Sequence, residues 1–169
     1  MTDRLWAPWR MEFIRRERLA SQGCVLCEYV GVVPAAGSLL LARRHHAFVV
    51  LNKYPYNSGH IMIVPNRHVH DPAQLLPEES HALWQLVTDS MAALRQATRC
   101  QGMNCGINLG RAAGAGIEEH LHVHLVPRWD GDNNFMPVLG EMRVVPEGLD
   151  RTWEHLAPAF LSLSSDPSF

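Results

Sequence analysis

Three histidines occupy alternate positions between residues 118 and 129: His120, His122 and His124. Alternate side chains of a β-strand share a face, so the spacing predicts a strand over 120–126 with its histidines on one surface. The intervening apolar residues would then enter the core: Leu121, Val123 and Leu125. Successive imidazoles would lie roughly 6–7 Å apart, at about 3.3 Å per residue. Such a row can bind a metal ion or carry nucleophilic and acid–base chemistry.

The remaining pattern predicts an α+β domain with a mainly antiparallel sheet. Apolar runs at 39–41 and 47–51 predict a hairpin, and residues 60–65 predict a buried strand that ends at a proline. Apolar residues at helical spacing predict a long helix from Pro77 to about Cys100. Shorter strands are expected at 105–109 and within 133–145, and a second helix over 149–163, interrupted at Pro158.

Length and composition predict a single domain over residues 1–169, with a basic and aromatic arm at 1–20 and an extension at 133–169. The arm is expected to hold a short helix at 11–19. A net charge of −2 argues against a nucleic-acid partner. No apolar run approaches the roughly 20 residues that span a bilayer, and no signal-peptide core is visible. We therefore expect a cytoplasmic protein without a membrane partner.

Two further segments contain residues suited to ligand binding. Cys24 and Cys27 form a Cys-x-x-Cys pair, which in a reducing compartment is typical of a metal site rather than a disulfide. Residues 110–116 form a glycine- and alanine-rich loop directly before the histidines. Backbone N–H groups in such a loop can approach an anion closely, although the Gly-Lys-Ser/Thr of a Walker motif is absent.

The segment His120-Leu121-His122-Val123-His124-Leu125-Val126 resembles the histidine-triad (HIT) family, as do Gly59-His60 before an apolar strand and Asn108 before the glycine loop. Residues 5–10, 51–57 and 127–135 resemble the branch of diadenosine tetraphosphate phosphorylases and hydrolases. The resemblance implies a five-stranded antiparallel sheet with one long and one C-terminal helix, extended across a homodimer. It also implies hydrolysis or transfer of nucleoside-phosphate groups.

The resemblance assigns His122 as a nucleophile that attacks the α-phosphorus and forms a covalent nucleotidyl-histidine. A main-chain carbonyl is expected to orient its other nitrogen. His124 and His60 would bind phosphate oxygens, and one of them would protonate the leaving group. Asn52 matches a position near the ribose, and Asn108 one that reaches a phosphate oxygen or the leaving group.

The loop departs from the family pattern. The family often has Gln or Ser where this chain has Gly116 and Ile117. Phosphate contacts are therefore expected from backbone N–H groups at Gly114 and Gly116, or from Arg111.

Some relatives complete a structural zinc site with a histidine after the strand that ends at Pro65 and the first histidine of the triad. In this chain the resulting set is Cys24, Cys27, His68 and His120, with His70 as the neighbouring alternative to His68. Two sulfur and two nitrogen ligands suit closed tetrahedral zinc.

Three functions stay open. The first is cleavage of a dinucleoside polyphosphate, or of a nucleoside phosphoramidate, by hydrolysis or phosphorolysis. The second is a zinc hydrolase with His120, His122 and His124 as ligands. The third is a non-catalytic nucleotide-binding module.

Overall fold

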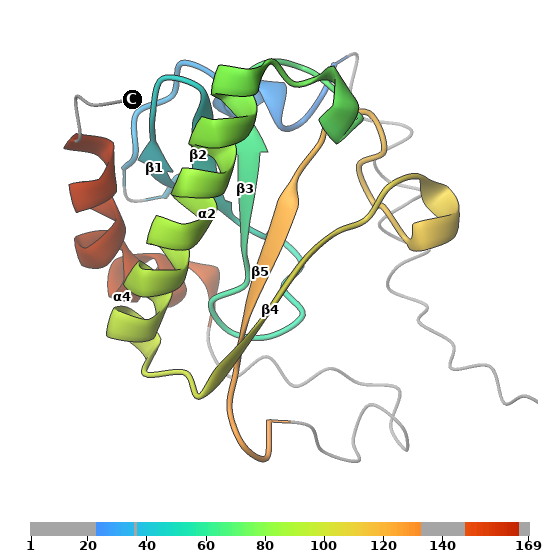
Figure 1. The fold of residues 1–169 in the computed structure, drawn as a ribbon. Helices are drawn as coiled ribbons and strands as arrows, with labels where there is room; N and C mark the ends of the chain where they lie inside the picture. Colours follow the sequence, from blue (N-terminus) through green and yellow to red (C-terminus); the bar gives the residue numbers. More distant parts are fainter. Residues whose placement is uncertain (1–22, 36, 133–147, 166–169) are drawn as a thin grey trace, which may run out of the picture.

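The computed structural model describes residues 23–35, 37–132 and 148–165. Five strands form one antiparallel sheet in the order β1-β2-β3-β5-β4 (Figure 1). The strands are β1 (Leu40–Arg43), β2 (Ala47–Leu51), β3 (Ile61–Pro65), β4 (Gly102–Ile107) and β5 (Val123–Arg128). The α-helices are α2 (Pro77–Thr98) and α4 (Leu149–Leu161). Short 3₁₀ helices span Cys27–Tyr29, Pro72–Gln74, Arg111–Ala113 and Ser162–Ser165. The predicted α+β fold is therefore confirmed, including the hairpin of β1 and β2.

The central strands are buried on both faces, which explains their continuous apolar sequences. In β2 and β3 alternate residues enter two separate cores. The first core lies against α2 and contains Val49, Leu51, Ile61 and Ile63. The second lies under the segment that carries Cys24 and Cys27, and contains Leu26, Phe48, Val50, Met62 and Val64. The sheet thus fixes the cysteine segment on the face opposite α2.

Helix α2 begins and ends close to the predicted residues. Pro77 stands at its first turn, where a missing N–H costs nothing. Glu79 accepts a hydrogen bond from the Leu76 N–H at 2.9 Å, and its carboxylate also pairs with Arg67. The helix stops at Arg99, whose φ of 51° is left-handed. Figure 1 shows α2 lying across the sheet, with α4 beside it.

The prediction that the C-terminal helix is interrupted at Pro158 is wrong. Helix α4 continues through this residue to Leu161. A proline removes one backbone hydrogen bond, and the buried side chains of Leu156 and Phe160 on either side hold the segment against the core. Trp153 also links α4 to β1, because its indole N–H donates to the Leu40 carbonyl at 2.9 Å.

Two strands differ from their predicted limits. Strand β4 starts at Gly102 rather than Cys105, and β5 starts at Val123 rather than His120. The predictions for the arm at 1–20 and for strands within 133–145 fall outside the described residues. No described helix is long and apolar enough to cross a membrane.

Candidate active site and metal centre

The histidine segment is only partly a strand. His120 and His122 precede β5, and His124 lies within it. The apolar residues of the segment nevertheless enter the core as predicted: Leu121, Val123 and Leu125. The sequence alternation therefore persists although the hydrogen-bonded ladder begins only at Val123.

His122 has a defined tautomer. Its side chain is buried, and its Nδ1 lies 2.8 Å from the main-chain oxygen of His120. A carbonyl oxygen can only accept, so Nδ1 carries the hydrogen and Nε2 carries the lone pair. Burial lowers the pKa of His122, and the hydrogen bond to the His120 carbonyl opposes this only in part. A neutral imidazole with its lone pair on Nε2 is suited to nucleophilic attack.

His60 and His124 form a hydrogen-bonded pair. The backbone N–H of Tyr56 donates to His60 Nδ1 at 3.0 Å, which places the His60 hydrogen on Nε2. His60 Nε2 lies 2.9 Å from His124 Nδ1 and donates to it. A neutral His124 must therefore carry its hydrogen on Nε2. Its ring centroid is 4.8 Å from that of His122, so a lone pair and an N–H donor occur on adjacent rings.

Gly59 allows the chain to deliver His60 to this position. Its φ is +74°, and a Cβ added there would lie 3.2 Å from Pro127 Cγ. Both the left-handed backbone and the close approach favour glycine. The loop before Gly59 also returns to the sheet, because the Asn52 N–H donates to the His60 carbonyl at 2.9 Å.

The two candidate asparagines lie on opposite sides of the histidines. Asn52 follows β2, and its amide nitrogen is 3.4 Å from the His60 ring. Asn108 follows β4, at the far edge of the sheet, and lines a hollow of about 220 Å³ with His124. Since β3 and β5 lie between β2 and β4, the structure places one amide on each side of the histidines.

The glycine loop contains a single 3₁₀ turn. Gly110 and Gly114 flank this turn with φ values of +73° and +84°. Gly116 follows and is exposed. Arg111 pairs with Glu118 at 2.9 Å on the surface, so a phosphate contact from Arg111 requires it to exchange partners.

The Cys-x-x-Cys pair, His68 and His120 come together. Their candidate ligand atoms all lie within 4.8 Å of one another. Cys24 Sγ is 3.3 Å from His120 Nδ1, and Cys27 Sγ is 3.2 Å from His68 Nδ1. His70 is not a member of the group. The described residues thus assemble two thiols and two imidazoles from three separate segments, a set that fits tetrahedral zinc.

His120 is already oriented as a metal ligand. Its Nε2 lies 2.9 Å from the Pro65 carbonyl oxygen, so this nitrogen carries the hydrogen and Nδ1 faces the sulfurs with its lone pair. A hydrogen bond from the second ring nitrogen to a carbonyl is the usual support for a metal-bound histidine. Burial lowers the pKa of His120 and raises the pKa of the Cys27 thiol.

Sequence reasoning missed several residues around the histidines. Tyr56 supplies the N–H that fixes His60, and its ring centroid is 4.6 Å from that of His60. Arg128 and Asn104 line the same hollow as His124. The Arg128-x-x-x-Asp132 spacing was the available signal for an ion pair. The proximity of Asn104 to His124 had no such signal, because it depends on the pairing of β4 with β5.

Comparisons with known proteins agree with this geometry. A family model described as HIT domain matches residues 35–131. AP-4-A phosphorylase of Mycobacterium tuberculosis (strain H37Rv) is 38% identical over 162 residues, covering 92% of this chain and 83% of that protein. Bis(5′-adenosyl)-triphosphatase of Dictyostelium discoideum is 30% identical over 90 residues, covering 52% of this chain and 60% of that protein.

Among solved structures, a Zn-bound histidine triad family protein from Mycobacterium smegmatis superposes with a TM-score of 0.66 and 25% identity. The match covers 85% of this chain and 96% of that one. The family model spans more than half of the residues, and the phosphorylase is similar over nearly the whole length. The chain therefore belongs to the HIT-domain family.

Proposed function

We propose that this chain cleaves dinucleoside polyphosphates, such as diadenosine tetraphosphate, at the α-phosphate through a covalent nucleotide on His122. The observation that carries the proposal is the 2.8 Å hydrogen bond from His122 Nδ1 to the His120 carbonyl, which leaves the Nε2 lone pair for attack. The names of the relatives from M. tuberculosis and D. discoideum support this substrate class.

In the first step His122 Nε2 forms a bond to the α-phosphorus while the bond from phosphorus to the leaving phosphate oxygen breaks. The electron pair of that bond leaves with the oxygen, and His124 Nε2–H donates a hydrogen bond that stabilises the charge developing there. His60 donates to His124 Nδ1 at 2.9 Å and so keeps the Nε2–H tautomer in place. In the second step an oxygen of water or inorganic phosphate attacks the same phosphorus, the P–N bond breaks, its electron pair returns to His122 Nε2, and any proton of the incoming oxygen is released to solvent.

The remaining candidates bind the substrate in this proposal. Asn52 contacts the ribose, and Asn108 donates its amide to a phosphate oxygen. Backbone N–H groups at Gly114 and Gly116 approach the α-phosphate, with Arg111 adding charge when it leaves Glu118. The placement of Asn52 and Asn108 on either side of the histidines supports their roles.

Cys24, Cys27, His68 and His120 would hold a structural zinc ion. Four protein ligands leave no open position, so bound zinc supplies rigidity and takes no part in the reaction. The ion would join the cysteine segment and the His68 loop to the residue whose carbonyl orients His122.

A homodimer that extends the sheet is also part of the proposal. Strand β4 is an edge strand in the described sheet, and four of its six residues are exposed. Exposed edges readily pair with another chain unless they are protected.

The zinc-hydrolase alternative has weaker support. Within the described residues the metal-capable group takes His120 from the histidine row, without His122 or His124. Those two residues are also hydrogen-bonded to different partners, His122 to the His120 carbonyl and His124 to the His60 ring.

The test is incubation with diadenosine tetraphosphate, with and without inorganic phosphate, followed by separation of the products. ADP and ATP formed only with phosphate identify a phosphorylase, and AMP and ATP formed without it identify an asymmetric hydrolase. His122→Ala should abolish turnover while nucleotide and zinc stay bound, and the exposed control His70→Ala should remain active. Loss of zinc in His122→Ala would instead favour the three-histidine metal site. A wild-type protein that binds nucleotide without turning over polyphosphates or phosphoramidates would be a binding module.

A further inference from the structure

A hollow runs beside His124 along β4 and β5. Its polar lining comes from Tyr56, Asn104, Asn108, His124 and Arg128. The register of the two strands pairs Gly106 with His124, and Asn104 with Val126. Since paired residues of antiparallel strands share a face, Asn104 and Gly106 lie on the same face as His124.

Gly106 keeps this hollow open. A Cβ added at Gly106 would have no heavy atom of the described residues within 4 Å, so these residues leave the space above it unfilled. Its φ is not positive, and other residues can adopt the same backbone conformation. The structure of the strand therefore does not require glycine here, and the lack of a side chain instead leaves room opposite His124.

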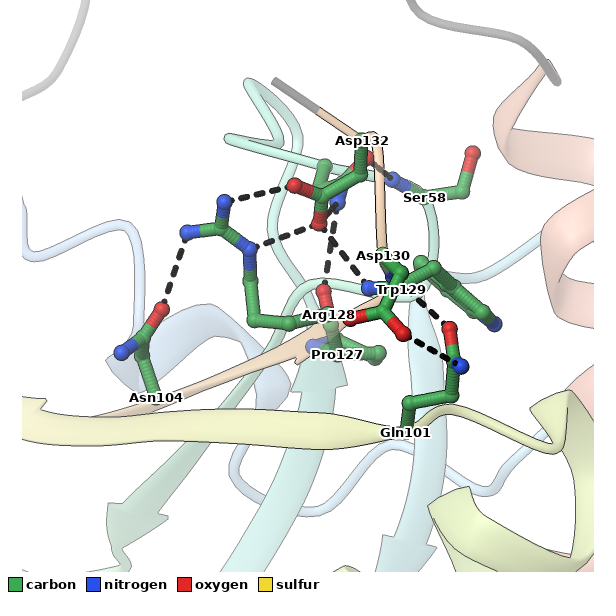
Figure 2. Close-up of polar contacts among 9 residues, drawn as sticks. Ser58, Gln101, Asn104, Pro127, Arg128, Trp129, Asp130 and Asp132 are labelled. Atoms are coloured by element: carbon green, nitrogen blue, oxygen red, sulfur yellow. Dashed lines mark hydrogen bonds and ion pairs between the residues drawn. The ribbon is translucent and has the colours of Figure 1, made fainter.

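Asn104 is held in one orientation. Arg128 Nη1 donates to Asn104 Oδ1 at 3.0 Å, so the oxygen of this amide faces the guanidinium. Figure 2 shows the Asn104 nitrogen on the side away from Arg128. An amide fixed through its oxygen presents its N–H₂ group as a donor.

Arg128 is itself anchored by Asp132. Both guanidinium-to-carboxylate contacts measure 2.7 Å, from Nε to Oδ2 and from Nη2 to Oδ1 (Figure 2). Asn57 Nδ2 and the Trp129 N–H also donate to Oδ2, at 2.9 and 3.1 Å. The Arg128 guanidinium lowers the pKa of Asp132 to about 2, so the pair stays charged at neutral pH. This network fixes the positive charge and the Asn104 amide at the end of the hollow.

The hollow lies on the side of the histidines opposite Asn52. Asn52 follows β2, whereas the hollow is built on β5 and β4, across β3. Displacement at phosphorus is in line, so the leaving group departs opposite His122 Nε2 while the nucleoside stays on phosphorus as an equatorial substituent. A nucleotide that extends towards Asn52 therefore leaves the β4 side to the leaving group.

We infer that this hollow binds the leaving polyphosphate of the substrate, with Asn104 donating to a phosphate oxygen and Gly106 leaving room for the chain. The inference rests on the proposed function and goes further, because it explains selection for a long, anionic leaving group. A nucleoside phosphoramidate, whose leaving group is small, would not use the hollow. Asn104 and Gly106 thus determine specificity, and Arg128 and Asp132 position Asn104.

The experiment compares kcat/KM for diadenosine tetraphosphate and for adenosine 5′-phosphoramidate in Asn104→Ala, Gly106→Ala and Gly106→Val. Loss of a hydrogen bond to a charged phosphate should lower the value for the tetraphosphate by about 10- to 100-fold in Asn104→Ala. Gly106→Val should lower it too, and Gly106→Ala should do so less, because it adds less bulk. The value for the phosphoramidate should change less than about twofold in all three. Each variant thereby has its own internal control for folding and for the state of His122 and His124.

An equal loss on both substrates, or no loss on either, would overturn the inference while leaving the proposed function intact. A wild-type protein that cleaves neither substrate would refute the proposed function, and binding would then decide the role of the hollow. For this arm, affinities for diadenosine tetraphosphate and AMP are measured in protein carrying His122→Ala. Addition of Gly106→Val should weaken binding of the tetraphosphate and leave AMP unchanged, and equal effects on both ligands would refute the hollow as a polyphosphate site.

Discussion

The proposed metal centre can be tested through Cys27→Ser. Cys27 contacts both histidines of the group, at 3.2 Å to His68 and 3.5 Å to His120. A metal bridging Cys27 and His120 links residues 93 positions apart. In the chain-entropy model, a cross-link that closes about 100 residues contributes roughly 4–5 kcal/mol. We therefore expect the variant to lose its zinc and about 4 kcal/mol of its free energy of unfolding.

The assay is thermal unfolding of wild-type and variant protein whose zinc content has been measured. For a domain of this size, about 4 kcal/mol corresponds to a decrease in Tm of roughly 8–16 °C. Cys105→Ser is the matched control, because Cys105 is exposed and lies outside the metal-capable group. A Cys27→Ser protein with one zinc per chain and an unchanged Tm would refute the assignment of the site.

The same substitution tests the link from the metal to the reaction. The side chain of His120 faces the sulfurs, and its carbonyl accepts the hydrogen of His122 Nδ1. If the loss of zinc lets His120 move, the His122 hydrogen bond weakens. A bond worth about 1.4 kcal/mol then corresponds to an approximately tenfold lower kcat. KM should change little, because Asn52 and Asn108 lie on other segments. A zinc-free variant with wild-type kcat would show that the carbonyl is held without the metal.

Three further substitutions test stability, each measured by chemical denaturation. The hydrogen bond from Arg67 lowers the pKa of Glu79 from 4.5 to about 2, so Glu79 stabilises the fold above pH 4.5 and loses this effect as pH falls towards 2. Glu79→Gln should lower the free energy of unfolding by about 1 kcal/mol at pH 7. It should also make this free energy depend less on pH between pH 4.5 and about 2, and an unchanged pH dependence would contradict the prediction. Ser90→Ala should stabilise by about 1 kcal/mol, because the buried Ser90 hydroxyl has no hydrogen-bond partner among the described residues and alanine favours helix; a loss of stability would reveal a missing partner. Asp89→Asn should cost about 3 kcal/mol, since Arg44 is buried and pairs with Asp89 at 2.7 Å; a cost below about 1 kcal/mol would mean that solvent screens Arg44.

Local patterns predicted the elements whose signals are local. Pro77 and the helical spacing of buried leucines located α2, and Pro65 located the end of β3. Strand β4 was harder, because Gly102, Asn104 and Gly106 have low strand propensity. The hydrogen-bonded pairing with β5 holds β4 in an extended conformation that its own residues do not favour.

The candidate site likewise combines features that the sequence predicted with contacts that only the fold creates. Residue types and the family resemblance suggested which histidines and cysteines belong together, and the structure brings the cysteines to His68 and His120 as expected. The contact between His60 and His124 joins residues 64 positions apart, and the Arg128–Asn104 contact depends on the register of β4 and β5. Such distances follow from the packing of the sheet and have no counterpart in a local sequence pattern.

The different surroundings of the three histidines follow from where the ladder between β3 and β5 stops. Its register pairs Ile63 with Val123, and two steps further would place Pro65 opposite Leu121. Pro65 has no N–H to donate, and the ladder ends before it. The Pro65 carbonyl instead accepts from His120 Nε2, which turns His120 Nδ1 towards the sulfurs. The His120 carbonyl accepts from His122 Nδ1, which leaves Nε2 of His122 with its lone pair. The equally spaced histidines therefore have different hydrogen-bond partners and different proposed roles. A substitution that restored an N–H at residue 65 would be expected to disturb both the metal centre and the proposed nucleophile.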